Sequence, residues 1–241
     1  MFVNFAHRGA SAYLPENTVE AFCLGLWMGA GGIETDVRRA SDGTLVLFHD
    51  DGLKRMTGRP GSVGDYTYRE LHDMDVSREG CKSVGRIVRF EDFARYFGHK
   101  DIIFQIELKA EDIERDVVEV MRGYGMAEKS FVSSFDAEKL GKVKSFAPDV
   151  RTCLLCGTYD ADTAALIRKI KADCVSLRAG GMTAQTVESA VKDGLRVHAW
   201  GVKNTEDMRR ALDCGVQGMT VNFPDVLANE LKIRGEDASN G

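Results

Sequence analysis

Residues 173–221 read DCVSLRAGGMTAQTVESAVKDGLRVHAWGVKNTEDMRRALDCGVQGMTV. Three short apolar runs, at 173–177, 195–200 and 218–221, alternate there with two longer amphipathic segments. A short apolar run is typical of a buried strand, and an amphipathic segment between two such runs is typical of a crossover helix. The stretch therefore predicts consecutive β–α units of a parallel sheet.

The same alternation extends over the whole chain. The other apolar runs are 2–6, 33–37, 102–108, 131–134 and 151–156. The expected helices are 18–30, 90–98, 111–125, 136–146, 161–171, 183–193, 204–214 and 225–232. Eight strand–helix units in a chain of 241 residues favour a closed (β/α)8 barrel, the TIM barrel, over an open sheet. We therefore predict a single domain over residues 1–241.

Residues that favour helix ends mark several of these units. Asp136, Thr183 and Asn204 stand where N-caps are expected. Gly194 and Gly215 stand where a helix should end before the next strand.

The second unit departs from the pattern. Residues 33–50 read IETDVRRASDGTLVLFHD, and Asp42-Gly43 between two extended runs predicts a hairpin with a two-residue turn. Paired positions then sum to 85, which places Asp36 opposite His49. Residues 51–89 hold six glycines and many charges. We expect them to form a small insertion over one end of the barrel.

Composition and charge argue against several classes of protein. Hydrophobic residues make up 44% of the chain and charged residues 29%, which is typical of a globular protein. A net charge of 32 − 37 = −5 argues against nucleic-acid binding. No apolar run approaches the ~18 residues of a membrane span. The first residues lack a basic region followed by an apolar core, so we expect no signal peptide and a cytoplasmic location.

The six cysteines show no metal motif. Only Cys153 and Cys156 have a suggestive spacing, and neither a second pair nor two regularly spaced histidines follow. We therefore expect structural cysteines. His198 falls two positions before Trp200 on one expected strand, so it is expected to line the barrel interior below it.

Polar side chains gather where the first three expected barrel strands end, which is where TIM barrels build their active sites. These residues are His7, Arg8, Glu34, Asp36, Glu107 and Lys109. Side chains two positions apart on a strand point to the same face, so Glu34 lies with Asp36 and Glu107 with Lys109. The hairpin would return His49 to the same level.

Two interpretations of these charges remain open. Buried carboxylates repel one another unless a cation joins them, and oxygen ligands without cysteine suit Mg²⁺ or Ca²⁺. Alternatively, the carboxylates pair with Arg8, Arg38 and Lys109. Two histidines at one mouth suggest a general acid and a general base. Arg8 and Lys109 would suit an anionic substrate such as a phosphate.

These residues resemble the glycerophosphodiester phosphodiesterase family in both identity and order, from His7 to about Pro224. The motifs are His7-Arg8-Gly9, Pro15-Glu16-Asn17-Thr18 with Ala21-Phe22, Glu34-x-Asp36, His49-Asp50, Glu107-x-Lys109 and Trp200. The resemblance implies a (β/α)8 barrel with a small insertion after the second strand. It also implies hydrolysis of a small-molecule glycerophosphodiester to an alcohol and glycerol phosphate, with one divalent cation as cofactor.

The resemblance also implies roles for the site residues. His7 and His49 would be the catalytic acid–base pair, and the metal ligands would be Glu34, Asp36 and Glu107. Arg8 and Lys109 would hold phosphate oxygens, and Trp200 would form an apolar wall near the glycerol. Glu16 and Asn17 would brace the loop after the first strand. Asn17 with Glu20 also resembles a capping box for the first helix.

One position departs from the family pattern. The family often has Thr-Asp-x-Pro after the last strand, whereas this chain has Asn222 between Thr220-Val221 and Phe223-Pro224. Three alternatives also stay open: action on lysophospholipids, a catalytically silent phosphodiester-binding barrel, and a glycosidase that uses the paired carboxylates. We expect short, water-soluble head groups to be preferred, because the insertion begins directly after the His49-Asp50 pair and would wall the cleft.

Overall fold

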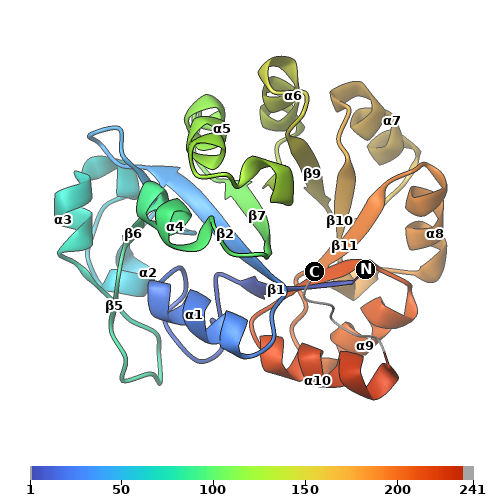
Figure 1. The fold of residues 1–241 in the computed structure, drawn as a ribbon, viewed down its shortest axis with the longest axis horizontal. Coiled ribbons are helices and arrows are strands. Elements are labelled where there is room, and N and C mark those ends of the chain that lie inside the picture. The colour runs from blue at the N-terminus through green and yellow to red at the C-terminus, as the bar shows by residue number, and fades with distance from the viewer. Residues whose placement is uncertain (1, 236–241) are drawn as a thin grey trace.

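The computed structural model describes residues 2–235, and Met1 and residues 236–241 of the predicted domain lie outside them. Within that range, eight parallel strands close into a barrel, because β1 pairs with both β12 and β2 (Figure 1). They are β1 (Val3–His7), β2 (Gly32–Arg39), β7 (Ile103–Leu108), β8 (Ser130–Ser134), β9 (Arg151–Cys156), β10 (Cys174–Arg178), β11 (Arg196–Trp200) and β12 (Gly218–Val221). The predicted TIM barrel is confirmed.

Helices surround the barrel, one after each strand. They are α1 (Val19–Trp27), α4 (Phe90–Phe97), α5 (Glu114–Gly123), α6 (Ala137–Phe146), α7 (Ala161–Ile170), α8 (Ala184–Lys192), α9 (Thr205–Asp213) and α10 (Pro224–Arg234). Short 3₁₀ turns lie at η2 (Ala127–Lys129) and η3 (Ala179–Gly181). No helix within residues 2–235 is long and apolar enough to cross a membrane.

Most of the predicted helix caps are correct. The side chains of Asp136, Thr183 and Asn204 each accept a backbone N–H at the start of their helices. The prediction for the first helix is wrong by one residue. Thr18 is its N-cap, because Thr18 is extended and its hydroxyl accepts the Ala21 N–H.

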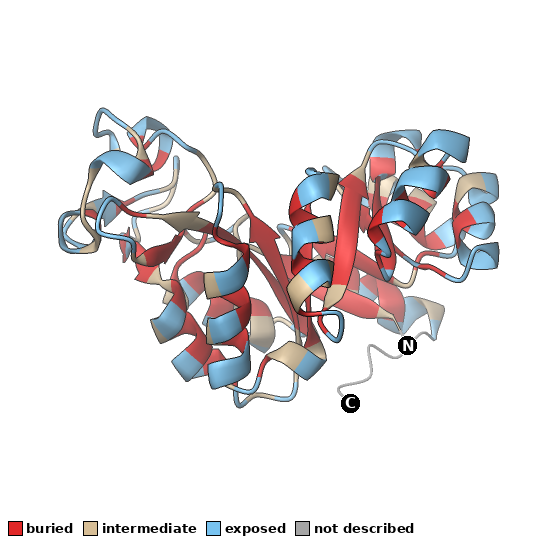
Figure 2. Cartoon of the chain, turned by 90° about the horizontal axis from the view of Figure 1, so that it is seen from above, coloured by how far each residue is buried: buried red, intermediate tan, exposed pale blue. Residues whose placement is uncertain are grey.

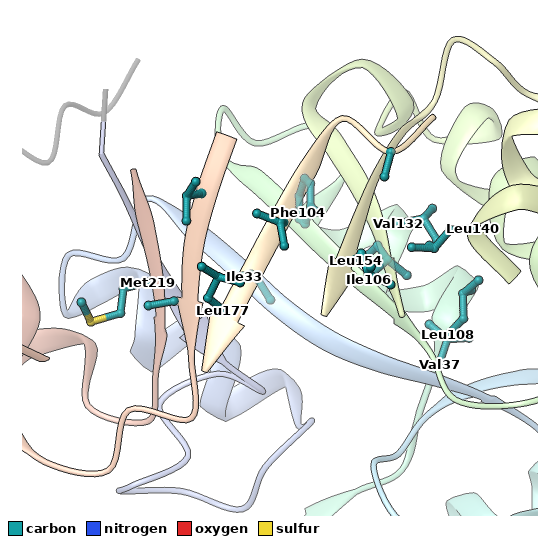
Figure 3. Close-up of a cluster of buried hydrophobic side chains, with 14 of the residues drawn as sticks. Ile33, Val37, Phe104, Ile106, Leu108, Val132, Leu140, Leu154, Leu177 and Met219 are labelled. Carbon is teal, nitrogen blue, oxygen red and sulfur yellow. The ribbon is translucent and has the colours of Figure 1, made fainter. Parts of the chain in front are cut away.

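The main core lies between the barrel and its helices. Buried residues follow the strands and the inner faces of the helices, while the outer helix faces are exposed (Figure 2). The outward side chains of neighbouring strands form one apolar layer, part of which is drawn in Figure 3. Labelled there are Ile33, Val37, Phe104, Ile106, Leu108, Val132, Leu140, Leu154, Leu177 and Met219.

The interior of the barrel is divided along its axis. A small apolar cluster that includes Phe5 and Phe131 fills the end where the strands begin. His198 lies with this cluster, as its position below Trp200 predicted, and its ring contacts both phenylalanines. The next inward-facing positions on β1 and β2, nearer the carboxyl end, hold the polar residues His7 and Glu34. The chemistry-bearing residues are therefore collected at the carboxyl end.

The insertion between β2 and α4 has a core of its own and lies at the left in Figure 1. Its elements are β3 (Leu45–Leu47), α2 (Lys54–Thr57), η1 (Val63–Asp65), α3 (Tyr68–His72), β4 (Asp75–Val76), β5 (Gly85–Arg86) and β6 (Val88–Arg89). Leu53 and Met56 are buried there, and Tyr66 and Tyr68 pack against them. These four side chains thus serve the insertion's own core.

The predicted hairpin register is wrong by one residue. Val37 pairs with Leu47 and Arg39 with Leu45, so paired positions sum to 84. The turn has three residues, because Ala40 donates its N–H to Thr44 at 2.9 Å and Gly43 takes a positive φ of 86°. Asp36 consequently faces Phe48, and His49 follows the end of the paired segment.

Candidate active site

A cavity of about 270 Å³ opens at the carboxyl end of the barrel. Its lining comes from loops and strands on all sides of the mouth: His7, Arg8, Glu34, His49, Gln105, Glu107, Lys109, Phe135, Leu155, Trp200, Gly201 and Thr220. Asp36 is fully buried beside them and forms ion pairs with two of the lining side chains. The predicted acid–base, carboxylate, cationic and tryptophan residues therefore meet in one place.

The three carboxylates form one cluster. One carboxylate oxygen each from Glu34, Asp36 and Glu107 lies within 4.8 Å of the other two, and all three residues are buried. Strand pairing explains the contact, since Asp36 lies directly beside Glu107 in the β2–β7 register. Oδ1 of Asp36 has no hydrogen-bond partner in the described residues. This donor set fits a hard divalent cation, because it offers converging, buried oxygen atoms.

The pKa values of the cluster reflect its burial and the charges gathered around it. Burial, together with the charge of Asp36, raises the pKa of Glu107 from 4.5 to about 7 and that of Glu34 well above its usual value. Burial acts on Asp36 in the same direction, but the charges of Arg8 and Lys109 outweigh it and lower its pKa to about 2. A bound cation would favour the ionised form of all three.

Cations from the chain partly compensate this charge. Arg8 Nε lies 3.0 Å from Asp36 Oδ2, and Lys109 Nζ lies 2.7 Å from Glu107 Oε1. Arg38 belongs elsewhere, because its guanidinium binds the His49 carbonyl and Asp51. Arg8 and Lys109 therefore form the predicted ion pairs with the carboxylates. The three carboxylates also converge, as the cation interpretation requires.

His7 is held by an amide. Its Nδ1 lies 2.5 Å from Oδ1 of Asn222, an atom that can only accept, so Nδ1 carries the hydrogen. The other ring nitrogen, Nε2, lies 3.8 Å from Glu34 Oε2 at the cavity. Burial, followed by the charge of Arg8, lowers the pKa of His7 to about 4. His7 thus presents an unprotonated Nε2 to the cavity.

His49 is held by a carboxylate. Its Nδ1 lies 2.6 Å from Asp50 Oδ1. Arg55 from the insertion binds the other oxygen of Asp50 through Nε at 2.5 Å. Burial lowers the pKa of His49, while the charge of Asp36 and the bond to Asp50 act against it. The insertion therefore fixes His49 through Asp50.

The loop after β1 is held in an unusual conformation. Arg8 and Asn17 have positive φ angles of 55° and 57°. Gly9, the residue after Arg8, also has a positive φ angle, of 84°. A Cβ atom on Gly9 would lie 2.4 Å from the backbone carbonyl carbon of Ala21 in α1. The loop can pass this close to the helix only because Gly9 has no side chain.

Glu16 and Asn17 contact the charged residues directly. The Asn17 amide donates to Asp36 Oδ2 at 3.0 Å and accepts from the Thr35 hydroxyl at 2.8 Å. These bonds explain why Asn17 does not cap α1. Glu16 joins Arg8 at 3.1 Å and Arg55 at 2.7 Å. The loop, the carboxylate cluster and the insertion are thereby linked.

Several residues at the site were not predicted. Gln105 lies two positions before Glu107, so strand alternation was a signal that could have found it. Phe135 directly follows β8, and its ring lies edge-to-face against Trp200 with centroids 5.0 Å apart. Its position after a barrel strand was a second available signal. Arg55 carried no such signal, because its partners are set by the fold of the insertion.

Known proteins resemble this chain over most of its length. The profile of the glycerophosphoryl diester phosphodiesterase family matches residues 7–226. The chain belongs to this family. Family membership confirms the predicted enzyme class, a phosphoric diester hydrolase. A glycerophosphodiester phosphodiesterase of Caldanaerobacter subterraneus subsp. tengcongensis is 33% identical over 239 residues, which cover 95% of this chain and 98% of that protein.

Solved structures of similar proteins share the fold. A glycerophosphodiester phosphodiesterase from Agrobacterium tumefaciens is 27% identical with a TM-score of 0.80, covering 95% of this chain and 100% of that one. An Oleispira antarctica phosphodiesterase, 21% identical, has a TM-score of 0.86 and covers 95% of this chain and 96% of that one.

Proposed function

We propose that this protein hydrolyses glycerophosphodiesters to an alcohol and glycerol phosphate, with His7 and His49 as the acid–base pair and one Mg²⁺ or Ca²⁺ ion as cofactor. The observation that carries the proposal is the shared cavity, which both histidines line together with Glu34 and Glu107. The Oleispira antarctica phosphodiesterase of the same fold is described in complex with the product sn-glycerol-3-phosphate, which supports the proposed product.

Glu34, Asp36 and Glu107 would hold the cation through their carboxylate oxygens. When bound, such an ion polarises a phosphoryl oxygen and neutralises charge that develops on it. Arg8 and Lys109 border the same carboxylates, so their remaining N–H groups are available to a phosphate in the cavity. The positive groups that pair with the carboxylates would then also bind the substrate anion.

The two histidines differ in their partners, which suggests different roles. A carboxylate beside an imidazole favours its protonated form, whereas a neutral amide adds no such charge. His49, with Asp50 behind it, is the better candidate for the general acid that protonates the leaving alkoxide from Nε2. His7, with Asn222 behind it, is the better candidate for the base that accepts the nucleophile's proton at Nε2.

The nucleophile is either water or the neighbouring hydroxyl of the substrate. The second route forms a cyclic phosphate that water then opens. Both routes need one proton acceptor and one proton donor, so the histidine assignment serves either. Detection of a cyclic glycerol phosphate in early samples of the reaction would distinguish them.

The apolar part of the substrate would meet Phe135, Leu155 and Trp200, which line the same cavity. The Trp200 ring is fixed, because its Nε1 donates to the Cys156 carbonyl at 2.9 Å. This small apolar surface is suited to glycerol or a short alcohol. Among residues 2–235, no residue of the insertion at 51–89 lines this cavity. The preference for short head groups therefore depends on the barrel's own loops.

The test measures the head-group alcohol released from a panel of glycerophosphodiesters and from a lysophospholipid, because both kinds of substrate yield that product. Each substrate is assayed with chelator, and again after Mg²⁺ or Ca²⁺ is restored. We expect release only with the cation and only from the small substrates. Activity that chelator does not reduce would remove the metal from the proposal. No release under any condition would favour the alternative of a silent phosphodiester-binding barrel.

A further inference from the structure

A second cluster of metal-binding side chains lies inside the barrel, near the amino ends of the strands. Cys153, Cys174 and His198 come from the consecutive strands β9, β10 and β11. The two sulfur atoms and a ring nitrogen of His198 all lie within 4.8 Å of one another. The exposed fractions of the three residues are 0%, 4% and 3%. Their burial and mutual approach resemble a ligand set more than a chance surface grouping.

His198 shows that this packing is incomplete. Both of its ring nitrogens are buried, and neither has a hydrogen-bond partner among residues 2–235. Buried polar groups are nearly always satisfied in folded proteins, so an orphaned imidazole indicates a missing partner. Burial lowers the pKa of His198 to about 3. The ring is therefore neutral, and one nitrogen has a lone pair to offer.

The position of the ring is fixed by its neighbours. It lies between Phe5 and Phe131, with ring centroids 5.5 Å and 5.2 Å away. On the next strand, a Cβ on Gly218 would come within 2.9 Å of His198 Cδ2. The glycine thus leaves just enough room for the imidazole at this level of the barrel.

A small cavity adjoins the cluster. Its volume is about 30 Å³, which is enough to hold a water molecule. Cys174 and His198 line it together with Arg151, Asp173 and Arg196, which lie at the amino ends of β9, β10 and β11. The cavity therefore lies at the amino end of the barrel, which is opposite the candidate active site.

We propose that Cys153, Cys174 and His198 bind one zinc ion, with a water molecule in the adjoining cavity as the fourth ligand. Bond lengths of about 2.3 Å to sulfur and about 2.0 Å to nitrogen place tetrahedral ligand atoms about 3.5–3.8 Å apart. The cluster already lies within 4.8 Å, so small side-chain rotations complete the site. The long contact of 3.6 Å from the Cys174 thiol to the Thr152 carbonyl would be given up.

Charge and ligand chemistry both favour zinc at this end. Binding releases the two thiol protons to solvent, and two thiolates with Zn²⁺ form a centre without net charge. A neutral centre suits the apolar surroundings of Phe5 and Phe131. The cluster at the other end of the barrel offers only carboxylate oxygens, which suit Mg²⁺ or Ca²⁺. The two ends of one barrel would thus select different ions.

The test uses cobalt(II) as a coloured probe for zinc, added to the reduced, metal-free full chain. A thiolate bound to cobalt gives a charge-transfer absorption band that carboxylate ligands do not give, so binding at the other end of the barrel does not interfere. We expect the band to saturate at one equivalent and to disappear when zinc is added. The result in the folded wild-type protein alone is decisive, because absence of the band overturns the proposal.

Variants locate the ion. Cys174→Ser should abolish the band and His198→Gln should weaken cobalt binding at least tenfold, with circular dichroism as the check on folding. Cys156→Ser is the matched control, because the Cys156 thiol contacts the Thr158 carbonyl and lies outside the cluster. The exposed Cys23 is a second site to exclude. A band that survives Cys174→Ser, or that is lost in Cys23→Ser, would show adventitious binding and overturn the proposal.

Discussion

Replacing Glu107 with glutamine removes one of the three buried carboxylates and keeps the size of the side chain. In the metal-free protein, the pKa of Glu107 is raised from 4.5 to about 7. The folded state therefore holds a proton that the unfolded chain releases above pH 4.5. By linkage, the contribution of Glu107 to the free energy of unfolding falls as the pH rises from about 4.5 to 7. Glutamine cannot ionise, so position 107 of the variant makes no such pH-dependent contribution to the free energy of unfolding.

The magnitude follows from the size of the shift. A change of 7 − 4.5 = 2.5 units corresponds to about 3 kcal/mol at 1.36 kcal/mol per unit. The partly exposed His7 works in the opposite sense, because its pKa is lowered to about 4. Its contribution to the free energy of unfolding rises with pH up to 6.5. Asp36, with a pKa of about 2, stays ionised above pH 5. Both contributions cancel when the variant is compared with the wild type at the same pH.

We therefore expect E107Q and the wild type to have similar stability in chelator at pH 5, with E107Q more stable by up to about 3 kcal/mol at pH 8. Urea unfolding followed by circular dichroism measures the difference. The exposed Glu111, on the loop that follows the same strand, provides the control E111Q, for which no such gain is expected. Added Mg²⁺ or Ca²⁺ should stabilise the wild type more than E107Q. An E107Q protein no more stable than the wild type at pH 8 would refute the argument that burial and the charge of Asp36 raise the pKa of Glu107.

Three further outcomes follow from the structure. His7→Ala and His49→Ala should each lower kcat by roughly 10²–10⁴ with an unchanged circular dichroism spectrum, and near-normal turnover would remove that residue from the mechanism. Asn222→Asp places a carboxylate beside His7, so the acidic limb of the pH–rate profile should move to higher pH; an unmoved limb would contradict the role given to the amide. Gly218→Ala should cost about 1–3 kcal/mol of stability because a Cβ would lie 2.9 Å from His198, whereas Gly123→Ala, with open space around it at the end of α5, should not destabilise the protein.

The barrel was predictable because each of its strands is a short apolar run bounded by polar or glycine residues. The outward faces of these strands carry side chains such as Ile33 and Leu154 in the main core, so the pattern reports burial directly. The register of the hairpin was not predictable to one residue. Asp42-Gly43 suits both a two-residue turn and the three-residue turn that forms, in which Gly43 alone takes a positive φ.

The chemical types at the site were predictable, but their partners were not. Glu34 and Asp36 alternate along one strand, so their shared face follows from strand geometry. The bond from His7 to Asn222 joins residues 215 positions apart, and only closure of the barrel brings them together. The cluster of Cys153, Cys174 and His198 has the same character, since each ligand comes from a different strand and no local spacing marks it.

The two halves of the barrel interior depend on each other. On β1, Phe5 precedes His7 by two positions, so the alternation that directs the histidine to the cavity directs the phenylalanine to the layer beneath it. Phe5 and Phe131 meet edge-to-face in this lower layer, with ring centroids 5.7 Å apart. Burial is the largest cause of the raised pKa of Glu34 above this layer. The apolar layer under the site thus helps to set the charge of the cluster that would receive the cation.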